Sequence, residues 1–429
     1  MRRDLVERWS SRTAFILASV GSAVGIGNIW RFSSVVGQNG GGAYLIPYLM
    51  AVFAFALPLM ILELAVGRRL RGDVVTAFGR ARREWRPLGW VVCAVVFLIL
   101  SYYLVVTGWT LAYVESSAAG RSVEFSDFTS TYDPIIYFVI SALLMGAIVS
   151  LGIKNGIERF TKLLVPFSFL LLLGLAAFSS TLPGYWEGMR FLFTPDFSVL
   201  TDPLLWGAAF GQAFFSLSVG YGILLTYGDY LDEGVRLLPS SFIITVADLT
   251  VAILAGMVIF PVVFTYGLEP AAGAELAFST LPLAFEVMPY GQAFAVAFFA
   301  LLFFAAMTSA VSMLEVSVAS ASRAFKVSRR AVSLVLTAGV IAVGLPSALS
   351  YTAAELQFNG MRILDIMDEV VGGFGLVLTA TLIAVTFTWL LDDRLLHKEI
   401  GMGSRFVLPI VKYAVPAIMA LTLGVKLIL

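Results

Sequence analysis

The chain has 429 residues, of which 59% are hydrophobic and only 13% are charged, and its mean hydropathy is +0.91. Soluble domains carry about a quarter charged residues, so this composition indicates an integral membrane protein. The net charge of zero gives no attraction to nucleic acid. Because the chain has a single cysteine, Cys93, and a single histidine, His397, a disulfide framework and a Cys/His zinc site are excluded.

Eleven apolar segments are long enough to cross a bilayer, whose hydrocarbon core needs about 20 apolar residues per helix. They cover residues 13–37, 43–66, 89–114, 134–152, 160–180, 204–228, 240–264, 291–322, 331–349, 364–391 and 405–429. Seven arginines gather between residues 68 and 86, after the second span, whereas the loop after the third span holds only Arg121. Positive residues collect on the cytoplasmic side, so we expect a multi-pass protein of the cell membrane with its N-terminus inside.

Two of these spans are interrupted by small and polar residues. The first contains GSAVGIGNIWRF at residues 21–32, and the sixth contains GQAFFSLSVGYGILLTYGDY at residues 211–230. Each is the first of a set of five spans, and because five is odd the second set starts on the opposite side of the membrane. Broken helices at matching places of an inverted repeat indicate a substrate site near the bilayer midplane. The alternative is two unrelated small-residue faces that let helices pack closely.

Several long motifs resemble the neurotransmitter:sodium symporter family in its short, eleven-helix form. They are GSAVGIGNIWRF, NGGGAYLIPY, PLMILELAVGR, SYY, SLSVGYG, AAMTSA and LDIMD, in this order along most of the chain. The resemblance implies an all-α membrane protein with the five-plus-five inverted repeat of the LeuT fold and broken helices 1 and 6. We therefore expect one transporter domain over residues 1–429. Its parts would be a first repeat at 13–180, an inverted second repeat at 204–391 and an additional helix at 405–429.

Unwinding a helix exposes carbonyls that can hold a cation and amides that can hold a carboxylate. The resemblance implies two sodium sites. The first would use the Ala23 carbonyl and the side chains of Asn28, Ser216 and Asp248. The second would use the carbonyls of Gly21, Val24 and Ala305 and the hydroxyls of Thr308 and Ser309. Oxygen ligands suit a hard cation. The alternative for the two hydroxyls is bonding to carbonyls of their own helix.

Asp248 stands where many members of the family carry a neutral asparagine, and chloride-dependent members bind chloride close by. A carboxylate buried in a membrane is costly and indicates a functional site. We expect Asp248 to supply the compensating negative charge, so that transport needs no chloride. Release of a proton from Asp248 as sodium binds, which would give proton antiport, is left open.

The resemblance also implies a substrate pocket. The substrate carboxylate would face the amides of Ile26 and Gly27 and the Tyr103 hydroxyl. Its ammonium would face the carbonyls of Ala23, Phe215 and Ser216 and the hydroxyl of Ser218. Its side chain would lie among Ile99, Tyr103, Phe215, Ser218, Tyr221, Ser309 and Met313.

Gly25 discriminates between substrate classes, because monoamine transporters of the family carry an aspartate there in place of the carboxylate that their substrates lack. A glycine predicts a substrate with its own carboxylate. The pocket set contains no charged side chain, and burying an unpaired charge costs several kcal/mol. We therefore expect a neutral, apolar amino acid. Met313 can repack, so an aromatic one remains possible.

Alternating access needs a barrier on each side of the substrate. Arg31 and Asp368 match the family's outer gate, with Tyr103 and Phe215 as an aromatic lid and Gln212 supporting Arg31; a static Arg31–Asp368 ion pair is the alternative. Glu63 matches a buried glutamate that braces unwound backbone.

The inner gate departs from the family pattern. Trp9 matches a family tryptophan, but the places of the usual arginine–aspartate pair hold Val6 and Arg323. One interpretation is a gate of reversed polarity, in which Glu7 or Asp4 pairs with Arg323 near Tyr230. The other pairs Arg8 with Asp229 or Asp232. Glu315, a further intramembrane carboxylate, has no assigned role.

These features predict sodium-coupled symport of a neutral amino acid by alternating access, within a lipid bilayer and without a nucleic-acid partner. An enzyme is disfavoured because no plausible catalytic set is present. The alternatives are a sensor of the same fold that binds an amino acid without transporting it, and a symporter for another small zwitterion.

Overall fold

The computed structural model describes residues 7–269 and 276–428, and most of them are helical. Up to Phe193 the elements are α1 (Arg12–Ala23), η1 (Gly27–Arg31), α2 (Phe32–Gln38), η2 (Gly41–Ala43), α3 (Leu45–Ala51), η3 (Val52–Ala56), α4 (Leu57–Leu70), α5 (Val74–Ala81), η4 (Arg83–Trp85), α6 (Arg86–Ala118), α7 (Phe125–Thr129), α8 (Asp133–Ser150), η5 (Ile153–Ile157), α9 (Glu158–Ser179) and α10 (Tyr185–Phe193).

The remaining elements include one short antiparallel hairpin, β1–β2, in which Gln357 pairs with Arg362. They are η6 (Phe197–Thr201), α11 (Pro203–Ser216), α12 (Ile223–Asp229), α13 (Leu237–Thr265), η7 (Leu276–Thr280), α14 (Leu281–Val287), α15 (Gly291–Phe325), α16 (Arg329–Leu349), β1 (Gln357–Phe358), β2 (Met361–Arg362), α17 (Ile363–Met367), η8 (Asp368–Gly375), α18 (Leu376–Trp389), α19 (Asp393–Ile400), η9 (Gly401–Gly403), α20 (Ser404–Pro409), η10 (Ile410–Ala414) and α21 (Val415–Ile428).

Nine continuous helical segments within the described residues are long and apolar enough to cross a membrane, and the bent pair α1 and η1–α2 makes a tenth. The remaining expected span, the sixth at residues 204–228, is divided into α11 and α12, which are too far apart in the chain to count as one helix. Helices that are apolar on all sides need either a protein core or lipid around them. The predicted multi-pass, all-helical architecture is therefore confirmed.

The first span breaks at Val24, which leaves the helix with φ −72° and ψ 97°. The helix axis turns by 56° between α1 and the following segment. The sequence explains this break, because the glycines of GSAVGIGN lower helix stability and Asn28 offers the backbone another partner: the Gly25 amide donates to its Oδ1 at 3.1 Å.

The sixth span breaks over residues 217–222, between α11 and α12. Gly220 and Gly222 have φ values of 86° and 69°, which glycine adopts without a steric penalty, and Ser218 has a φ of 52°. Both predicted broken helices, 1 and 6, are therefore present.

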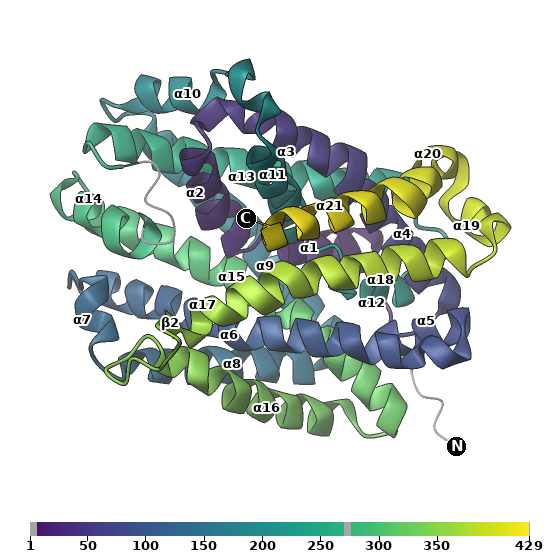
Figure 1. Cartoon of the computed structure of the whole chain (residues 1–429). Coiled ribbons are helices and arrows are strands. Elements are labelled where there is room, and N and C mark those ends of the chain that lie inside the picture. Colours follow the sequence, from purple (N-terminus) through teal and green to yellow (C-terminus); the bar gives the residue numbers. More distant parts are fainter. Residues whose placement is uncertain (1–6, 270–275, 429) are drawn as a thin grey trace.

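Figure 1 shows the arrangement of the helices. The long helices α6, α15, α16 and α18 run roughly side by side, with α5 and α19 at one end and α7, α10 and α14 at the opposite end. We call the first of these the N-terminal end and the second the distal end. The broken spans occupy the interior, where α1 contacts α9, α13 and α15, and α12 contacts α4 and α15.

Candidate functional site

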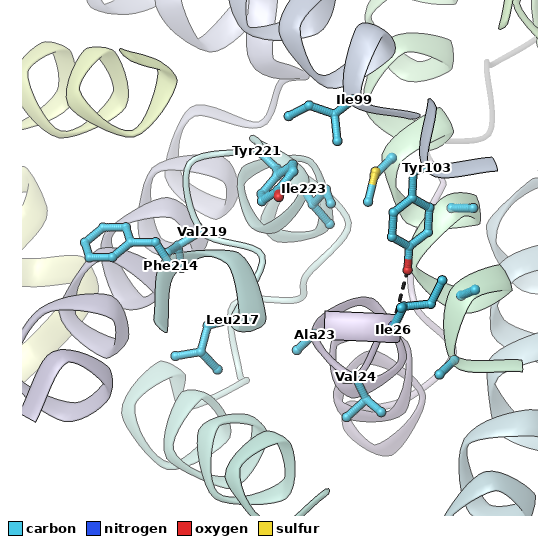
Figure 2. Packing of buried hydrophobic residues seen from close by; sticks show 14 of the residues in the cluster. Ala23, Val24, Ile26, Ile99, Tyr103, Phe214, Leu217, Val219, Tyr221 and Ile223 are labelled. Atoms are coloured by element: carbon cyan, nitrogen blue, oxygen red, sulfur yellow. Dashed lines mark hydrogen bonds between the residues drawn. The ribbon is translucent and has the colours of Figure 1, made fainter. Parts of the chain in front are cut away.

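The breaks of the first and sixth spans lie opposite each other in the interior. Figure 2 shows Ala23, Val24 and Ile26 of the first span facing residues 214–223 of the sixth, with Ile99 and Tyr103 of α6 beside them. The Ile26 amide donates to the Tyr103 hydroxyl at 3.4 Å. Two groups predicted to hold the substrate carboxylate are thus adjacent.

Three side chains predicted for the first sodium site form one buried cluster. The Asn28 Nδ2 atom donates to Asp248 Oδ1 at 2.6 Å and to Ser216 Oγ at 2.9 Å. The Ser216 hydroxyl donates to Asp248 Oδ2 at 2.7 Å. All three residues are at most 1% exposed. They come from η1, α11 and α13, so the two helix breaks and one continuous helix build the cluster together.

No arginine or lysine among the described residues lies within 4.0 Å of the Asp248 carboxylate. A buried carboxylate without a cationic partner is strongly disfavoured unless a cation binds beside it. The Asp248 carboxylate and the Ser216 hydroxyl are ligands of the kind that a hard cation prefers, whereas Asn28 faces them with its amide nitrogen and its Oδ1 atom accepts from the Gly25 amide. The cluster therefore fits a sodium ion by its chemistry.

Four of the five residues predicted for the second sodium site, all except Ser309, line a small cavity of about 40 Å³. Gly21, Val24, Ala305 and Thr308 all line it, at the junction of α1, α9, α13 and α15. The Thr308 hydroxyl donates to the Ala305 carbonyl at 3.0 Å, inside its own helix, which is the alternative that the sequence left open. The Ser309 hydroxyl donates across to the Ser22 carbonyl of α1 at 3.0 Å.

Two glycines of the first span make room for neighbouring side chains. A Cβ atom on Gly25 would lie 2.7 Å from the Ser309 hydroxyl and 3.1 Å from the Tyr103 hydroxyl. A Cβ atom on Gly27 would lie 2.5 Å from the Phe215 ring. Any larger residue at these positions would therefore displace predicted substrate contacts.

The apolar members of the predicted substrate set are buried: Ile99 is fully buried, and Tyr221 and Met313 are 2% and 4% exposed. The Ser218 hydroxyl, predicted to face the substrate ammonium, donates to the Ser22 carbonyl at 2.9 Å. Ser218 and Ser309 thus bind the same carbonyl from opposite spans.

The predicted outer gate is only partly assembled. The Arg31 guanidinium lies over the Phe215 ring, 4.6 Å from its centre. Arg31 and Asp368, both described by the structure, form no ion pair within 4.0 Å; Asp368 instead accepts a hydrogen bond from the Tyr102 hydroxyl at 3.0 Å. Gln212 donates to the Gly27 carbonyl at 2.8 Å, and its Oε1 atom has no hydrogen-bond partner among the described residues. The predicted Arg31–Asp368 ion pair is therefore not formed here, and Gln212 forms no hydrogen bond to Arg31.

Glu63 of α4 reaches the break of the sixth span, where its Oε1 atom accepts a hydrogen bond from the Gly220 amide at 2.7 Å. The side chain is fully buried. This contact satisfies a backbone amide that no helix satisfies.

Replacing Glu63 with alanine should lower the free energy of unfolding by about 2 kcal/mol, because it leaves the buried Gly220 amide without an acceptor. Glu63→Gln retains an oxygen that can accept this bond and should cost less. Thermal unfolding of the two variants in detergent, without ligands, measures the difference. Equal losses in both variants would contradict the bracing role.

At the predicted inner gate, the structure contradicts the first of the two predicted pairings, in which Glu7 pairs with Arg323. Arg323 contacts Asp229 Oδ2 at 2.8 Å and Asp73 Oδ2 at 3.2 Å, whereas Glu7 accepts a hydrogen bond from the Ile153 amide at 3.4 Å. The predicted Glu7–Arg323 pair is wrong, because Arg323 already has two carboxylates from other parts of the chain. Its alternative partner, Asp4, lies outside the described residues, as does Val6.

The second predicted pairing is partly present. Arg8 and Asp232 form an exposed ion pair at 2.5 Å, while Asp229 pairs with Arg323 instead. Trp9, which lies next to Arg8, donates from its indole to the Tyr227 carbonyl at 3.1 Å and from its amide to the Tyr230 carbonyl at 3.3 Å. The segment before α1 is therefore attached to α12.

Sequence reasoning missed the partner of Glu315. This fully buried carboxylate contacts Arg329 of α16, whose Nη1 atom lies 2.9 Å away, and accepts a hydrogen bond from the Tyr230 hydroxyl at 2.6 Å. A carboxylate inside an apolar helix needs a cation nearby. Glu315 itself was therefore the signal that could have found Arg329, 14 residues later in the chain.

A helical membrane protein whose first and sixth spans unwind around a buried polar cluster has the architecture of a secondary transporter. The sequence matches the Sodium:neurotransmitter symporter family over residues 6–133 and 126–428, and the chain belongs to this family. The predicted family is thereby confirmed.

Relatives extend over almost the whole chain. An uncharacterized sodium-dependent transporter of Haemophilus influenzae is 33% identical over 96% of both chains. The crystal structure of MhsT in complex with L-phenylalanine is similar with a TM-score of 0.89 and 37% identity, over 97% of this chain and 99% of that one. The sodium-dependent neutral amino acid transporter B(0)AT2 of Bos taurus is 28% identical over 61% of this chain and 41% of its own length. The chain is thus a sodium-dependent transporter with the LeuT fold.

Proposed function

We propose that this protein is a sodium-coupled symporter of a neutral, apolar amino acid that works by alternating access. The observation that carries the proposal is the fully buried cluster of Asp248, Asn28 and Ser216 beside both helix breaks, where no cationic side chain of residues 7–269 or 276–428 pairs with the carboxylate. A transported cation that binds next to this carboxylate would compensate its buried charge, which gives the carboxylate a function. We place the protein in the cell membrane with its N-terminal end facing the cytoplasm, as the arginine-rich loop indicates.

Sodium binding and substrate binding would be coupled because both sites lie at the break of the first span. Asn28 belongs to the cluster, and the Ile26 and Gly27 amides, two residues or fewer away in the sequence, would hold the substrate carboxylate. The substrate then supplies a further negative charge beside the cation, so each strengthens the binding of the other. The cavity at Gly21 and Thr308 is the second proposed sodium site.

The proposed substrate class is supported by the space around Gly25. A Cβ atom there would meet Ser309 and Tyr103, so an aspartate that replaces a missing substrate carboxylate has no room. The predicted substrate set contains no charged side chain, which favours a neutral amino acid. MhsT with bound L-phenylalanine and the neutral amino acid transporter B(0)AT2, both similar to this chain, agree with this class.

A thermal-shift screen of the purified protein against the twenty amino acids, in sodium and in potassium buffer, tests this function. Binding to the folded state raises the melting temperature by mass action. We expect neutral amino acids to stabilise the protein in sodium only. If no amino acid stabilises it in either buffer, the proposed substrate class is wrong. Accumulation of the best ligand in proteoliposomes then separates a transporter from a sensor, which binds without accumulation.

Transport should not depend on chloride, because Asp248 provides a fixed negative charge next to the first proposed sodium site. Replacing external chloride with gluconate should leave the initial rate of sodium-driven uptake unchanged. A loss of most of the uptake would show that the Asp248 carboxylate does not replace chloride. Replacing sodium with potassium in the same assay is the positive control, since it should abolish uptake.

A further inference from the structure

Arg323 joins two carboxylates that lie far apart in the sequence. It is in the last turn of α15, and its guanidinium contacts Asp229 at the end of α12 and Asp73 just before α5. Asp229 and Asp73 have side chains that are only 4% and 1% exposed, whereas that of Arg323 is 43% exposed. The arginine therefore covers two nearly buried negative charges at the N-terminal end of the protein. We call Arg323, Asp229 and Asp73 the arginine clamp.

The Asp73 carboxylate is fixed independently of the arginine. It caps α5, accepting hydrogen bonds from the Thr76 amide at 3.0 Å and from the Thr76 hydroxyl at 2.7 Å. A carboxylate that is held in this way keeps its position when another partner leaves. Asp73 thus holds the Arg323 guanidinium beside the contact between α12 and α15.

Asp229 belongs to a different part of the structure, which consists of α12 and the chain segment before α1. It ends α12, the second half of the broken sixth span, and the chain segment before α1 is attached to α12 through Trp9 and through the Arg8–Asp232 ion pair. Among the ion pairs of the described residues, only Arg323–Asp229 joins this part to α15. Two hydrogen bonds from tyrosine hydroxyls accompany it, between Tyr227 and the Ser312 hydroxyl and between Tyr230 and the Glu315 carboxylate.

We propose that the arginine clamp is the inner gate of this protein, with the arginine on α15 and the opposing acid on α12. This inference rests on the proposed alternating access. Moving α12 and the start of α1 away from α15 separates Asp229 from Arg323, and the nearly buried Asp229 carboxylate then loses its cation. Because an uncompensated buried charge is unfavourable, the clamp favours the state in which the N-terminal end is closed. Asp73 is the positioning residue that keeps Arg323 ready to close the gate again.

A cysteine reporter measures the opening directly. Ser312 is fully buried on α15 against Tyr227, so Ser312→Cys, in a Cys93→Ala background, places one thiol under the gate. In potassium buffer without substrate, Arg323→Asp should raise the rate of reaction with a water-soluble maleimide about tenfold, because three carboxylates then repel one another at the clamp. Adding Asp229→Arg restores one arginine between two carboxylates and should return the rate to within about twofold of the parent.

The control is Arg330→Asp, which makes the same change of charge at an exposed position seven residues later in the chain, in the first turn of α16. It should leave the labelling rate unchanged. The proposal is overturned if Arg323→Asp labels no faster than Arg330→Asp, or if the double variant labels as fast as the single one. Asp73→Asn provides a second variant that retains the cap oxygen, and it should give a smaller increase than Arg323→Asp. The labelling rate is measured without substrate. The gate proposal can therefore fail or hold independently of the proposed amino acid substrate, which the thermal-shift screen tests.

Discussion

Replacing Asp248 with asparagine is expected to weaken sodium binding about 100-fold, which corresponds to about 2.8 kcal/mol. The side chain keeps nearly the same shape and can still bond to Ser216, but it no longer carries the charge that balances the cation in a fully buried site. The sodium concentration for half-maximal stabilisation, from thermal-shift titrations at a saturating amino acid concentration, measures this change. Added chloride should restore part of the affinity by replacing the lost charge.

Asp196→Asn is the matched control for Asp248→Asn, because Asp196 is exposed and its hydrogen bonds are to the neighbouring Ser198. Its sodium titration should coincide with that of the parent. If Asp248→Asn also titrates like the parent while its melting temperature without ligand is unchanged, Asp248 takes no part in sodium binding. The cluster around it would then be a purely structural hydrogen-bond network.

The second large effect is expected at Gly25. Gly25→Ala places a methyl group 2.7 Å from the Ser309 hydroxyl and 3.1 Å from the Tyr103 hydroxyl, closer than carbon and oxygen approach without displacement. Both hydroxyls belong to the proposed substrate pocket. We expect amino acid affinity to fall about 100-fold, or about 2.8 kcal/mol. Titrating the best ligand from the thermal-shift screen measures the loss.

Gly207→Ala controls for the general effect of a glycine substitution in a broken span. Gly207 lies in α11, and a Cβ atom there would meet no other atom within 4 Å. Alanine is the better helix former, so this variant should bind the amino acid as the parent does. Parent-like affinity in Gly25→Ala would show that the substrate binds away from the first helix break.

Local features of the sequence predicted the elements of the site well. The break at Val24 follows from glycines and an asparagine within an apolar run, and the break at residues 217–222 follows from two glycines that adopt positive φ. Asp248 is the only charged residue of the 29-residue helix α13. Because a lone carboxylate in such a helix is costly, its position indicates a functional site, and the family resemblance predicts that this is a sodium site.

The partners of charged side chains depended on the tertiary structure. Arg323 contacts Asp73, 250 residues away in the sequence, and Asp229, 94 residues away. Glu7 was the nearer candidate by family position, but its carboxylate contacts the Ile153 amide. Similarly, Asp368 contacts Tyr102 rather than Arg31.

The sequence by itself therefore determined the membrane spans, the two helix breaks and the residue types that surround them. Hydropathy, helix propensity and the cost of a buried charge act on each segment separately, so they can be recognised in one dimension. Only the tertiary structure decided which carboxylate meets which arginine and which carbonyl each hydroxyl binds. These contacts depend on how neighbouring helices are rotated and shifted against each other, because a hydrogen bond or an ion pair is lost when its atoms move apart by little more than 1 Å.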